Sequence, residues 1–251
     1  MKTIRIFGTC GLILILGAAL GVGVGFTSPA FAQTFPIPVI VNPDGKVTYL
    51  GALGGTYSSA SGINDSGQVV GNSYTTRDDP FHARAFITGP NGMGMTDLGT
   101  LGGARSEASG INDSGQVVGT SRTADVSDHA FITGPNGVGM TDLGTLGGAR
   151  SEASGINDSG QVVGYSLTNG SNSSHAFITG PNGVGMIDIN SYADLPDGII
   201  LTEAFWINNL GQVIATAIPE PASYALMLAG LGLVGFMARG KRVTDNIIAR
   251  G

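Results

Sequence analysis

The 251-residue chain has almost no cysteine, and the one it has, Cys10, lies in an apolar N-terminal block. Residues 33–218 can therefore form neither a disulfide nor a thiolate metal site. Charged residues are also scarce, at 12% of the chain. Apolar residues at sustained helical spacing are missing from residues 33–218, which argues against a helical domain.

Basic residues are the scarcest charged class in this central part. Residues 33–218 carry six Lys and Arg against sixteen Asp and Glu, a net charge of about −10. A surface this acidic gives no electrostatic footprint for a phosphate backbone, so nucleic acid is excluded as a partner. The length fits one domain of ordinary size, and the low charge with regularly spaced apolar residues argues against disorder.

The first 32 residues have the features of a secretory signal peptide. Lys2 and Arg5 form a positive start, residues 6–26 are uncharged, and Ala30 and Ala32 precede Gln33. Small residues at these two positions predict cleavage by signal peptidase before Gln33, and therefore export across the inner membrane. The long apolar run leaves an uncleaved signal anchor as an alternative.

The C-terminal end carries a second apolar segment between prolines and basic residues. Residues 222–238 are uncharged and would span about 26 Å as a helix, which is enough to cross the hydrocarbon core. The flanking residues are Pro219, Glu220 and Pro221 before this segment, and Arg239, Lys241 and Arg242 after it. The physics alone predicts a transmembrane anchor with its basic end in the cytoplasm.

This order of Pro-Glu-Pro, apolar helix and basic cluster resembles the PEP-CTERM sorting signal of Gram-negative bacteria over residues 219–242. The resemblance implies processing by an exosortase, an integral-membrane cysteine protease, and delivery to the cell surface or the exopolysaccharide matrix. The short tail of residues 243–251 departs from the family, in which the basic cluster usually ends the chain.

The part of the chain between the two signals is an internal repeat. Residues 85–119 and 130–164 superimpose without a gap and differ only at Met93 and Val138. The repeat core Gly-Ile-Asn-Asp-Ser-Gly-Gln-Val-Val-Gly occupies residues 62–71, 110–119 and 155–164, with a partial copy at 206–215. Two half-copies flank the full units: residues 38–55 match the second half of a unit, and residues 202–215 match the first half.

Each unit is expected to contain four short strands, exemplified by residues 107–112, 116–121, 130–134 and 139–143. Asp and Ser favour turns by bonding their own backbone, and Gly adopts the left-handed conformation that such turns need. The predicted turn residues are Asp65, Gly67, Asp113, Gly115, Asp158 and Gly160. The fold class is therefore all-β.

The two half-copies predict how the units assemble. Together they make a fourth unit from opposite ends of the chain, and closing a ring removes exposed strand edges. A unit of about 45 residues with four strands fits a propeller blade. Residues 33–218 are accordingly predicted to be a closed four-bladed β-propeller whose last blade is shared by both ends. An open β-solenoid is the first alternative and a mixed β-sandwich the second.

The repeat is also similar to the HAF-repeat extracellular proteins, named after a His-Ala-Phe run. The runs at residues 129–131 and 175–177 match this signature, and Leu-Gly-Gly follows the pattern at 101–103 and 146–148. The resemblance implies secretion and a repeated β fold, and it carries over no activity.

The histidines are the first candidates for chemistry, because imidazole serves as both a base and a metal ligand. His129 and His175 occupy equivalent positions, while His82 is two residues out of register and Arg84 stands in its place. Without cysteine support, structural histidines at strand edges are favoured over a metal site.

Two sets of acidic residues also recur in register: Glu107, Glu152 and Glu203, and Asp97, Asp142 and Asp188. Acid–base catalysis needs two carboxylates in different environments, whereas repeats make their environments alike, so a glycosidase is disfavoured. The Asn-Asp-Ser-Gly turns lack the spacing of a calcium loop, and turn capping is favoured over calcium binding. No catalytic, cofactor or metal residue is predicted.

The units differ mainly in a polar segment after their second strand, at residues 72–81, 120–128 and 165–174. Repeat proteins often place such insertions on a binding face. The segments are interpreted as either a recognition surface or solvated spacers.

The sequence as a whole favours a non-enzymatic secreted protein of the cell surface or exopolysaccharide matrix. A carbohydrate-binding or adhesion module is the alternative, and an envelope hydrolase is the least favoured class. The expected partners are signal peptidase, exosortase, exopolysaccharide and, before processing, the membrane through residues 222–238.

Overall fold

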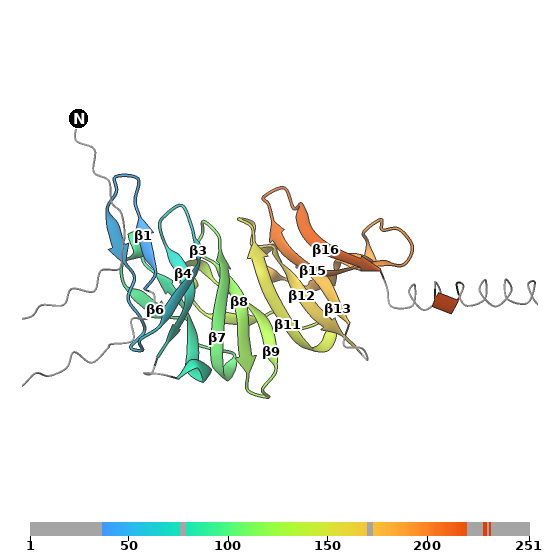
Figure 1. Ribbon diagram of the computed structural model, residues 1–251, viewed down its shortest axis with the longest axis horizontal. Helices are drawn as coiled ribbons and strands as arrows, with labels where there is room; N and C mark the ends of the chain where they lie inside the picture. The colour runs from blue at the N-terminus through green and yellow to red at the C-terminus, as the bar shows by residue number, and fades with distance from the viewer. Residues whose placement is uncertain (1–36, 76–78, 170–172, 220–227, 230, 232–251) are drawn as a thin grey trace, which may run out of the picture. The chain divides into compact units, whose positions relative to one another are not determined.

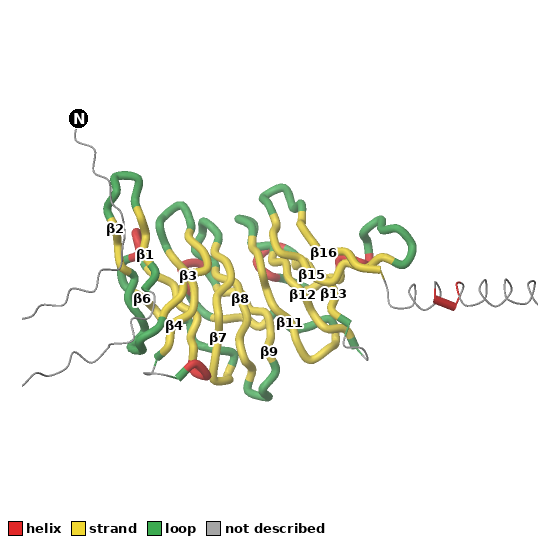
Figure 2. Tube along the Cα trace, in the orientation of Figure 1, coloured by secondary structure: helices red, strands yellow, loops and turns green. Residues whose placement is uncertain are grey.

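The computed structural model describes residues 37–75, 79–169, 173–219, 228–229 and 231. The described residues belong to one compact unit, residues 35–251. Between residues 37 and 219 they form short strands joined by turns and single 3-10 turns, so the all-β expectation is confirmed (Figures 1 and 2). The predicted signal peptide, residues 1–32, and most of the predicted span, residues 222–238, lie outside the described residues.

The described residues form sixteen strands in a regular series of antiparallel hairpins. The strands are β1 (Val39–Val41), β2 (Val47–Tyr49), β3 (Ser58–Ile63), β4 (Val69–Tyr74), β5 (Ala83–Thr88), β6 (Met95–Asp97), β7 (Gly102–Ile111), β8 (Val117–Thr123), β9 (Asp128–Thr133), β10 (Met140–Asp142), β11 (Gly147–Ile156), β12 (Val162–Thr168), β13 (Ser174–Thr179), β14 (Met186–Asp188), β15 (Ile199–Ile207) and β16 (Val213–Pro219). The 3-10 turns are η1 (Pro80–His82), η2 (Pro90–Gly92), η3 (Pro135–Gly137), η4 (Pro181–Gly183) and η5 (Ile189–Ser191).

The strands group into three complete units and two half-units. Unit A is the sheet β3–β6, unit B is β7–β10 and unit C is β11–β14, each with its strands paired in chain order. The N-terminal hairpin is β1–β2 and the C-terminal hairpin is β15–β16. A single parallel bridge, Arg150 with Asp128, joins unit C to unit B.

Local chemistry explains the first hairpin of every unit. In unit B the Asn112 carbonyl accepts from Gly115 N at 3.0 Å, and Gly115 has φ 78°, a conformation in which a Cβ would be strained. The first strand of each unit then contains a bulge, located between Ala108 and Gly110 in unit B. Gly119 lies opposite this bulge, and a Cβ there would overlap the Glu107 carbonyl oxygen. The glycines of the repeat are therefore fixed by turn and bulge geometry.

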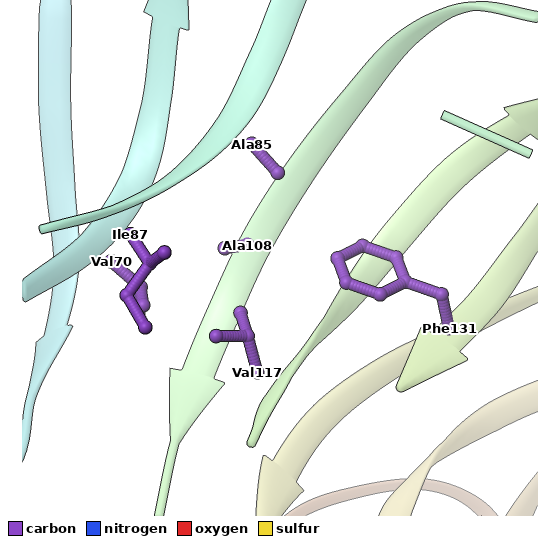
Figure 3. Close-up of a cluster of buried hydrophobic side chains, with 6 residues drawn as sticks. All are labelled: Val70, Ala85, Ile87, Ala108, Val117 and Phe131. Carbon is purple, nitrogen blue, oxygen red and sulfur yellow. The ribbon is translucent and has the colours of Figure 1, made fainter. Parts of the chain in front are cut away.

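The core lies between successive units, because each sheet is apolar on both faces. Adjacent valines of the second strand point in opposite directions: in unit B, Val117 packs toward unit A and Val118 toward unit C. Phe131 packs with Val117 against Val70 and Ile87 of unit A (Figure 3). The same arrangement recurs between units B and C. Burying both faces explains why the second strands have consecutive apolar residues where a half-exposed strand would alternate.

The two half-units extend this series at its first and last positions. Ile40 and Leu50 of the N-terminal hairpin pack against Val69 and Phe86 of unit A. Ala204 of the C-terminal hairpin packs with Val163 of unit C. The units thus follow one another in chain order, from the N-terminal hairpin through units A, B and C to the C-terminal hairpin.

The predicted closed ring with a shared blade is not formed. The hairpins β1–β2 and β15–β16 are separate two-stranded sheets in the described part of the chain. Each has already buried one face against a different unit, so neither depends on the other for that contact. Sequence periodicity counts the units, whereas closure depends on the angle between them. The described sheets are not closed, so the four-bladed propeller is not confirmed, and the open β-solenoid stays a prediction.

In the N-terminal half-unit, β1 is shifted by one residue relative to the gap-free sequence alignment. Leu50 N donates to Pro38 O at 3.1 Å, as Leu98 N does to Ala85 O at 2.9 Å. A Cβ on Gly92 would meet Ile40, and a Cβ on Gly137 would meet Ile87. Ile40 is therefore the counterpart of Ile87, one residue away from the gap-free sequence alignment, because the β1–β2 turn is one residue shorter.

Candidate functional site

The asparagines directly before the predicted turn residues form a hydrogen-bonded ladder that links the units. The Asn64 side-chain amide donates to Asn112 O at 3.1 Å, the Asn112 amide to Asn157 O at 3.0 Å, and the Asn157 amide to Asn208 O at 3.1 Å. Asn64 and Asn112 are buried. This ladder is structural, since each side chain satisfies a backbone carbonyl of the next unit.

The aspartates of the same turns form a second, more exposed row. Asp65 N donates to Asp113 Oδ1 at 3.1 Å, and Asp113 N donates to Asp158 Oδ1 at 3.2 Å. Asp158 N in turn donates to Asn209 Oδ1 at 3.0 Å. These carboxylates accept from the turn of the preceding unit, whereas the sequence predicted that they bond their own turn. That role belongs to the asparagines, whose Oδ1 accepts from the Gln N four residues later. Among the described residues no three His, Cys, Asp or Glu side chains are grouped to hold a metal ion.

The in-register histidines and aspartates, which the sequence presented as separate candidates, contact each other. His129 Nδ1 lies 2.8 Å from Asp142 Oδ2, and His175 Nδ1 lies 2.6 Å from Asp188 Oδ2. Each pair connects the third and fourth strands of its unit. His82, which is out of register, instead lies 2.5 Å from Asp79 Oδ2, three residues earlier.

The aspartates of the two in-register pairs have a further structural role. Asp142 Oδ1 also accepts from Gly144 N at 2.7 Å, and Asp188 Oδ1 accepts from Asn190 N at 2.9 Å. Each carboxylate therefore fixes the turn that follows its strand.

The repeated glutamates occupy a strip across units B and C and the C-terminal hairpin, and their surroundings differ. Glu152 forms an ion pair with Arg150. Burial raises the pKa of Glu203, and the negative charge of Glu152 raises it further. Burial likewise raises the pKa of Tyr165, together with a hydrogen bond to Glu152. Two neighbouring glutamates in different environments are thus present: Glu152 is paired with Arg150, whereas burial and the charge of Glu152 disfavour ionisation of Glu203.

The most distinctive polar feature is a charged pocket of about 270 Å³ between units B and C. Asp128 is at its centre: its Oδ2 lies 3.0 Å from Arg105 Nη2, and its Oδ1 lies 3.1 Å from Arg122 Nε. The Asp128 side chain is only 11% exposed. Burial opposes its ionisation, but the hydrogen bond from Arg122 and the charge of Arg105 keep the pKa of Asp128 below its usual value. The lining residues are Arg105, Ser106, Glu107, Thr120, Arg122, Asp128, Arg150 and Glu152. We call this the charged pocket.

The charged pocket arises where unit B departs from the repeat. Its residues Thr120, Arg122 and Asp128 belong to the variable segment 120–128, and Leu167 of unit C stands in the place of Arg122. Arg105 and Arg150 are equivalent residues of units B and C. The sequence pointed to the variable segment as a possible binding face, but the grouping of Arg105, Arg122 and Asp128 was missed. The one signal that could have found it was the three charged residues of this otherwise mostly polar insertion, Arg122, Asp125 and Asp128.

One of the flanking residues of the predicted sorting signal, Pro219, lies within the described residues. Pro219 is the last residue of β16 and is the register partner of Ile199. Glu220, Pro221, Arg239, Lys241 and Arg242 lie outside the described residues, as do Ala30, Ala32 and Gln33. Within the described part of the chain, no helix is both long and apolar enough to cross a membrane.

Comparison with known proteins identifies one part of the chain. Residues 217–242 match the model of the PEP-CTERM protein-sorting motif. The chain carries an exosortase sorting signal. This signal supports an exosortase-targeted protein, with export and a cell-surface or extracellular destination. No curated protein matches the chain.

Proposed function

We propose that this chain is a non-enzymatic scaffold protein of the cell surface or exopolysaccharide matrix, of the HAF-repeat type, delivered by an exosortase. The observation that carries the proposal is the connection of the sorting motif at residues 217–242 to a stack of near-identical β units. Signal peptidase would remove residues 1–32 on export, and residues 222–238 would hold the protein in the membrane until the exosortase acts.

The contacts of the polar residues support a scaffold better than an enzyme. The in-register histidines bind aspartates of their own unit, and the turn asparagines and aspartates bind the next unit. These side chains are used to hold sheets and turns in place. A catalytic site needs groups of unlike environment directed at one point, and the repeat distributes its acidic residues over successive units instead.

Loss-and-rescue in the producing cells tests the scaffold role. Cells that lack the protein are complemented with the full chain or with a variant carrying Glu107→Gln, Glu152→Gln and Glu203→Gln, and retention of the polysaccharide matrix is measured. Equal rescue is expected, since the amide keeps the shape of each side chain. Failure of a secreted and folded triple variant to rescue would overturn the non-enzymatic proposal. Replacing residues 219–221 by alanine is the matched sorting variant and should leave the protein unprocessed in the membrane fraction.

Carbohydrate binding at the charged pocket is the second candidate function. The pocket places guanidinium and carboxylate groups around one small cavity, and such groups hydrogen-bond the hydroxyls of a sugar in both directions. Binding of the full chain to purified matrix oligosaccharides is compared with that of Arg122→Leu, which installs the residue found at the equivalent place in unit C. A tenfold loss of affinity is expected. Unchanged affinity, or no binding by either protein, would exclude the pocket as a sugar site.

A further inference from the structure

Two hairpins of the protein expose apolar residues at positions that the complete units bury. On the C-terminal hairpin, Trp206 is 67% exposed and Ile214 is 64% exposed. Val118 and Val163, the counterparts of Ile214 in units B and C, are 0% exposed. On the N-terminal hairpin, Val39 is 42% and Val41 is 66% exposed, whereas their counterparts in unit A, Phe86 and Thr88, are buried. Exposed apolar surface of this kind marks an interaction site.

The strands that the two hairpins lack are complementary. The C-terminal hairpin supplies the first and second strands of a unit, and the N-terminal hairpin supplies the third and fourth. Among the described strands, β16 pairs only with β15, and β1 pairs only with β2. In the complete units the second strand pairs with the third, as β12 does with β13. Each hairpin is therefore missing the neighbour that the other could provide.

We propose that a second copy of this chain completes the missing unit. The strand β16 of one copy pairs antiparallel with β1 of the next, so that one four-stranded sheet forms from two chains. The contact is head-to-tail, because it joins unlike ends of identical molecules, and it generates either rings or filaments. Such an assembly would make the proposed matrix scaffold multivalent. Only this biological role of the assembly rests on the proposed function.

The complete units fix the register of this pairing. In unit C, Val163 is opposite Ile178 and Gly164 is opposite Phe177. The corresponding residues place Ile214 of one copy opposite Ile40 of the next, and Ala215 opposite Val39. Pro38 does not interfere, since its counterpart Ala85 directs its N–H away from the second strand, to Ser106 Oγ at 3.0 Å. The missing N–H of proline thus costs no bond across the junction.

Trp206 has a matching groove at the other end of the molecule. It stands in the place of Gly110 and Gly155. A Cβ on Gly155 would be 2.9 Å from Phe205 O, so the packing inside the molecule leaves no room for a side chain there, and the junction between two copies must be wider at this point. A groove of about 350 Å³ lies between the N-terminal hairpin and β3, and its lining includes Ser61, Gly62 and Ile63. Ile63 is 56% exposed.

The geometry inside the molecule indicates which residues Trp206 contacts in that groove. A Cβ on Gly110 would lie 3.8 Å from Ile156 Cγ2 of the next unit. Ile63 is the counterpart of Ile156 in unit A. The indole of Trp206 is thereby directed at Ile63 of the second copy, in the one place where the first strand has no sheet packed against it.

The asparagine ladder is also complementary at its two ends. Its last member, Asn208, donates to Gln212 Oε1 at 2.8 Å but has no carbonyl of a following unit to bind in the described part of the chain. Its first member, Asn64, donates onward to unit B, and its own carbonyl stands where the preceding unit's amide would bind. In the assembly, the Asn208 amide of one copy donates to Asn64 O of the next.

Cysteine cross-linking of the full chain in mild detergent tests the register. Ile214→Cys and Ile40→Cys are combined in a Cys10→Ser background, and oxidised samples are separated without reductant. A ladder of disulfide-linked dimers and larger species is expected. The matched control combines Ile214→Cys with Val41→Cys, whose side chain lies on the opposite face of β1. It should form no disulfide between chains and should migrate as a single chain on the same gel. A disulfide formed only within single chains, or none at all, would overturn the proposal.

Intrinsic fluorescence gives an independent readout, because Trp206 is the only tryptophan. Its emission should shift to shorter wavelength as the protein concentration rises, in parallel with the mass measured by sedimentation. Trp206→Arg is expected to sediment as a monomer at every concentration while keeping the circular dichroism of the parent. An emission that is already blue-shifted and independent of concentration would contradict a second copy and indicate closure within one chain. Matrix retention is a separate measurement, so failure of the scaffold role and failure of the assembly can be told apart.

Discussion

The side-chain amide of Asn112 lies 3.0 Å from the backbone oxygen of Asn157, the equivalent asparagine 45 residues later. The same bond connects Asn64 to Asn112 and Asn157 to Asn208. Each unit thus uses one side chain both to shape its own turn and to satisfy the turn of the next unit. Substitutions along this ladder can distinguish how much a buried asparagine and the last, exposed asparagine each contribute to the free energy of unfolding.

Asn112→Ala should strongly destabilise the protein, whereas Asn208→Ala should not. Asn112 bonds Gln116 twice, through Oε1 at 2.8 Å and N at 2.9 Å. Its loss leaves the buried Gln116 N without its acceptor and removes one of the two donors to Asn157 O, which keeps Gly160 N. An unsatisfied buried group and the lost bonds cost about 3 kcal/mol together. Asn208 is exposed, so its variant should lose less than about 1 kcal/mol. Urea unfolding of both variants at low protein concentration measures the difference, and equal losses would contradict a structural ladder.

The burial of both sheet faces predicts unequal effects at equivalent valine and isoleucine positions. Val118 is fully buried between units B and C, and its replacement by alanine should cost about 2 kcal/mol through lost burial and a residual cavity. Ile214, at the same strand position of the C-terminal hairpin, loses a larger side chain but is 64% exposed. Its alanine variant should change the unfolding free energy of the dilute protein by less than about 1 kcal/mol. A larger loss for Ile214→Ala than for Val118→Ala would show that the C-terminal hairpin is covered within the single chain.

Asp128 makes stability depend on pH in the acid range. Its folded-state pKa is below the unfolded value of about 3.9, so its contribution is present above that pH and is lost as the pH falls through the folded pKa. The Asp128→Asn variant should be less stable than the parent at pH 7, and the gap should narrow as the pH falls below 4. Thermal unfolding between pH 2 and pH 7 measures this gap. Asp194→Asn, at an exposed position, is the control and should follow the parent throughout.

Glu203 should have the opposite dependence. Burial, and then the charge of Glu152, raise its folded-state pKa above the unfolded value, so ionisation of Glu203 opposes folding as the pH rises through this window. Glu203→Gln is expected to stabilise the protein at pH 7 by less than about 1 kcal/mol, since the group is only partly buried. The gain should disappear at acid pH, once Glu203 is protonated in the folded and the unfolded protein. A destabilised variant at pH 7 would mean that the carboxylate of Glu203 is favourably paired.

The strands and turns of the units could be predicted from sequence, because the interactions that form them are local. Gly115 and the bulge opposite Gly119 are encoded within a single hairpin. The relation between units could not be predicted in the same way. The period of the repeat predicts how many sheets form, but the angle between two packed sheets depends on side chains from both. The described sheets do not close into a ring. The one-residue displacement of Ile40 has a similar origin, since the shorter β1–β2 turn was hidden by the good match that follows it.

The candidate site illustrates the same limit. The His129–Asp142 pair joins two residues that the sequence had picked out for recurring in register, and the pairing of β9 with β10 brings them together. Arg105 and Asp128 are 23 residues apart and meet only because β7 and β9 both flank β8. Neither residue stands out in the repeat on its own. A charged cluster of this kind becomes visible only when the strand order is known.

The overlap between β16 and the sorting motif has a consequence for maturation. The strand extends to Pro219, opposite Ile199, while the matched motif begins at residue 217. The recognition sequence therefore has no spacer to separate it from the folded domain. A membrane protease that binds the motif from its first residue has to separate the last residue pairs of β15 and β16. Under the proposed anchoring and exosortase processing, release would depend on how readily this terminal hairpin opens, and any contact that stabilises β16 would slow it.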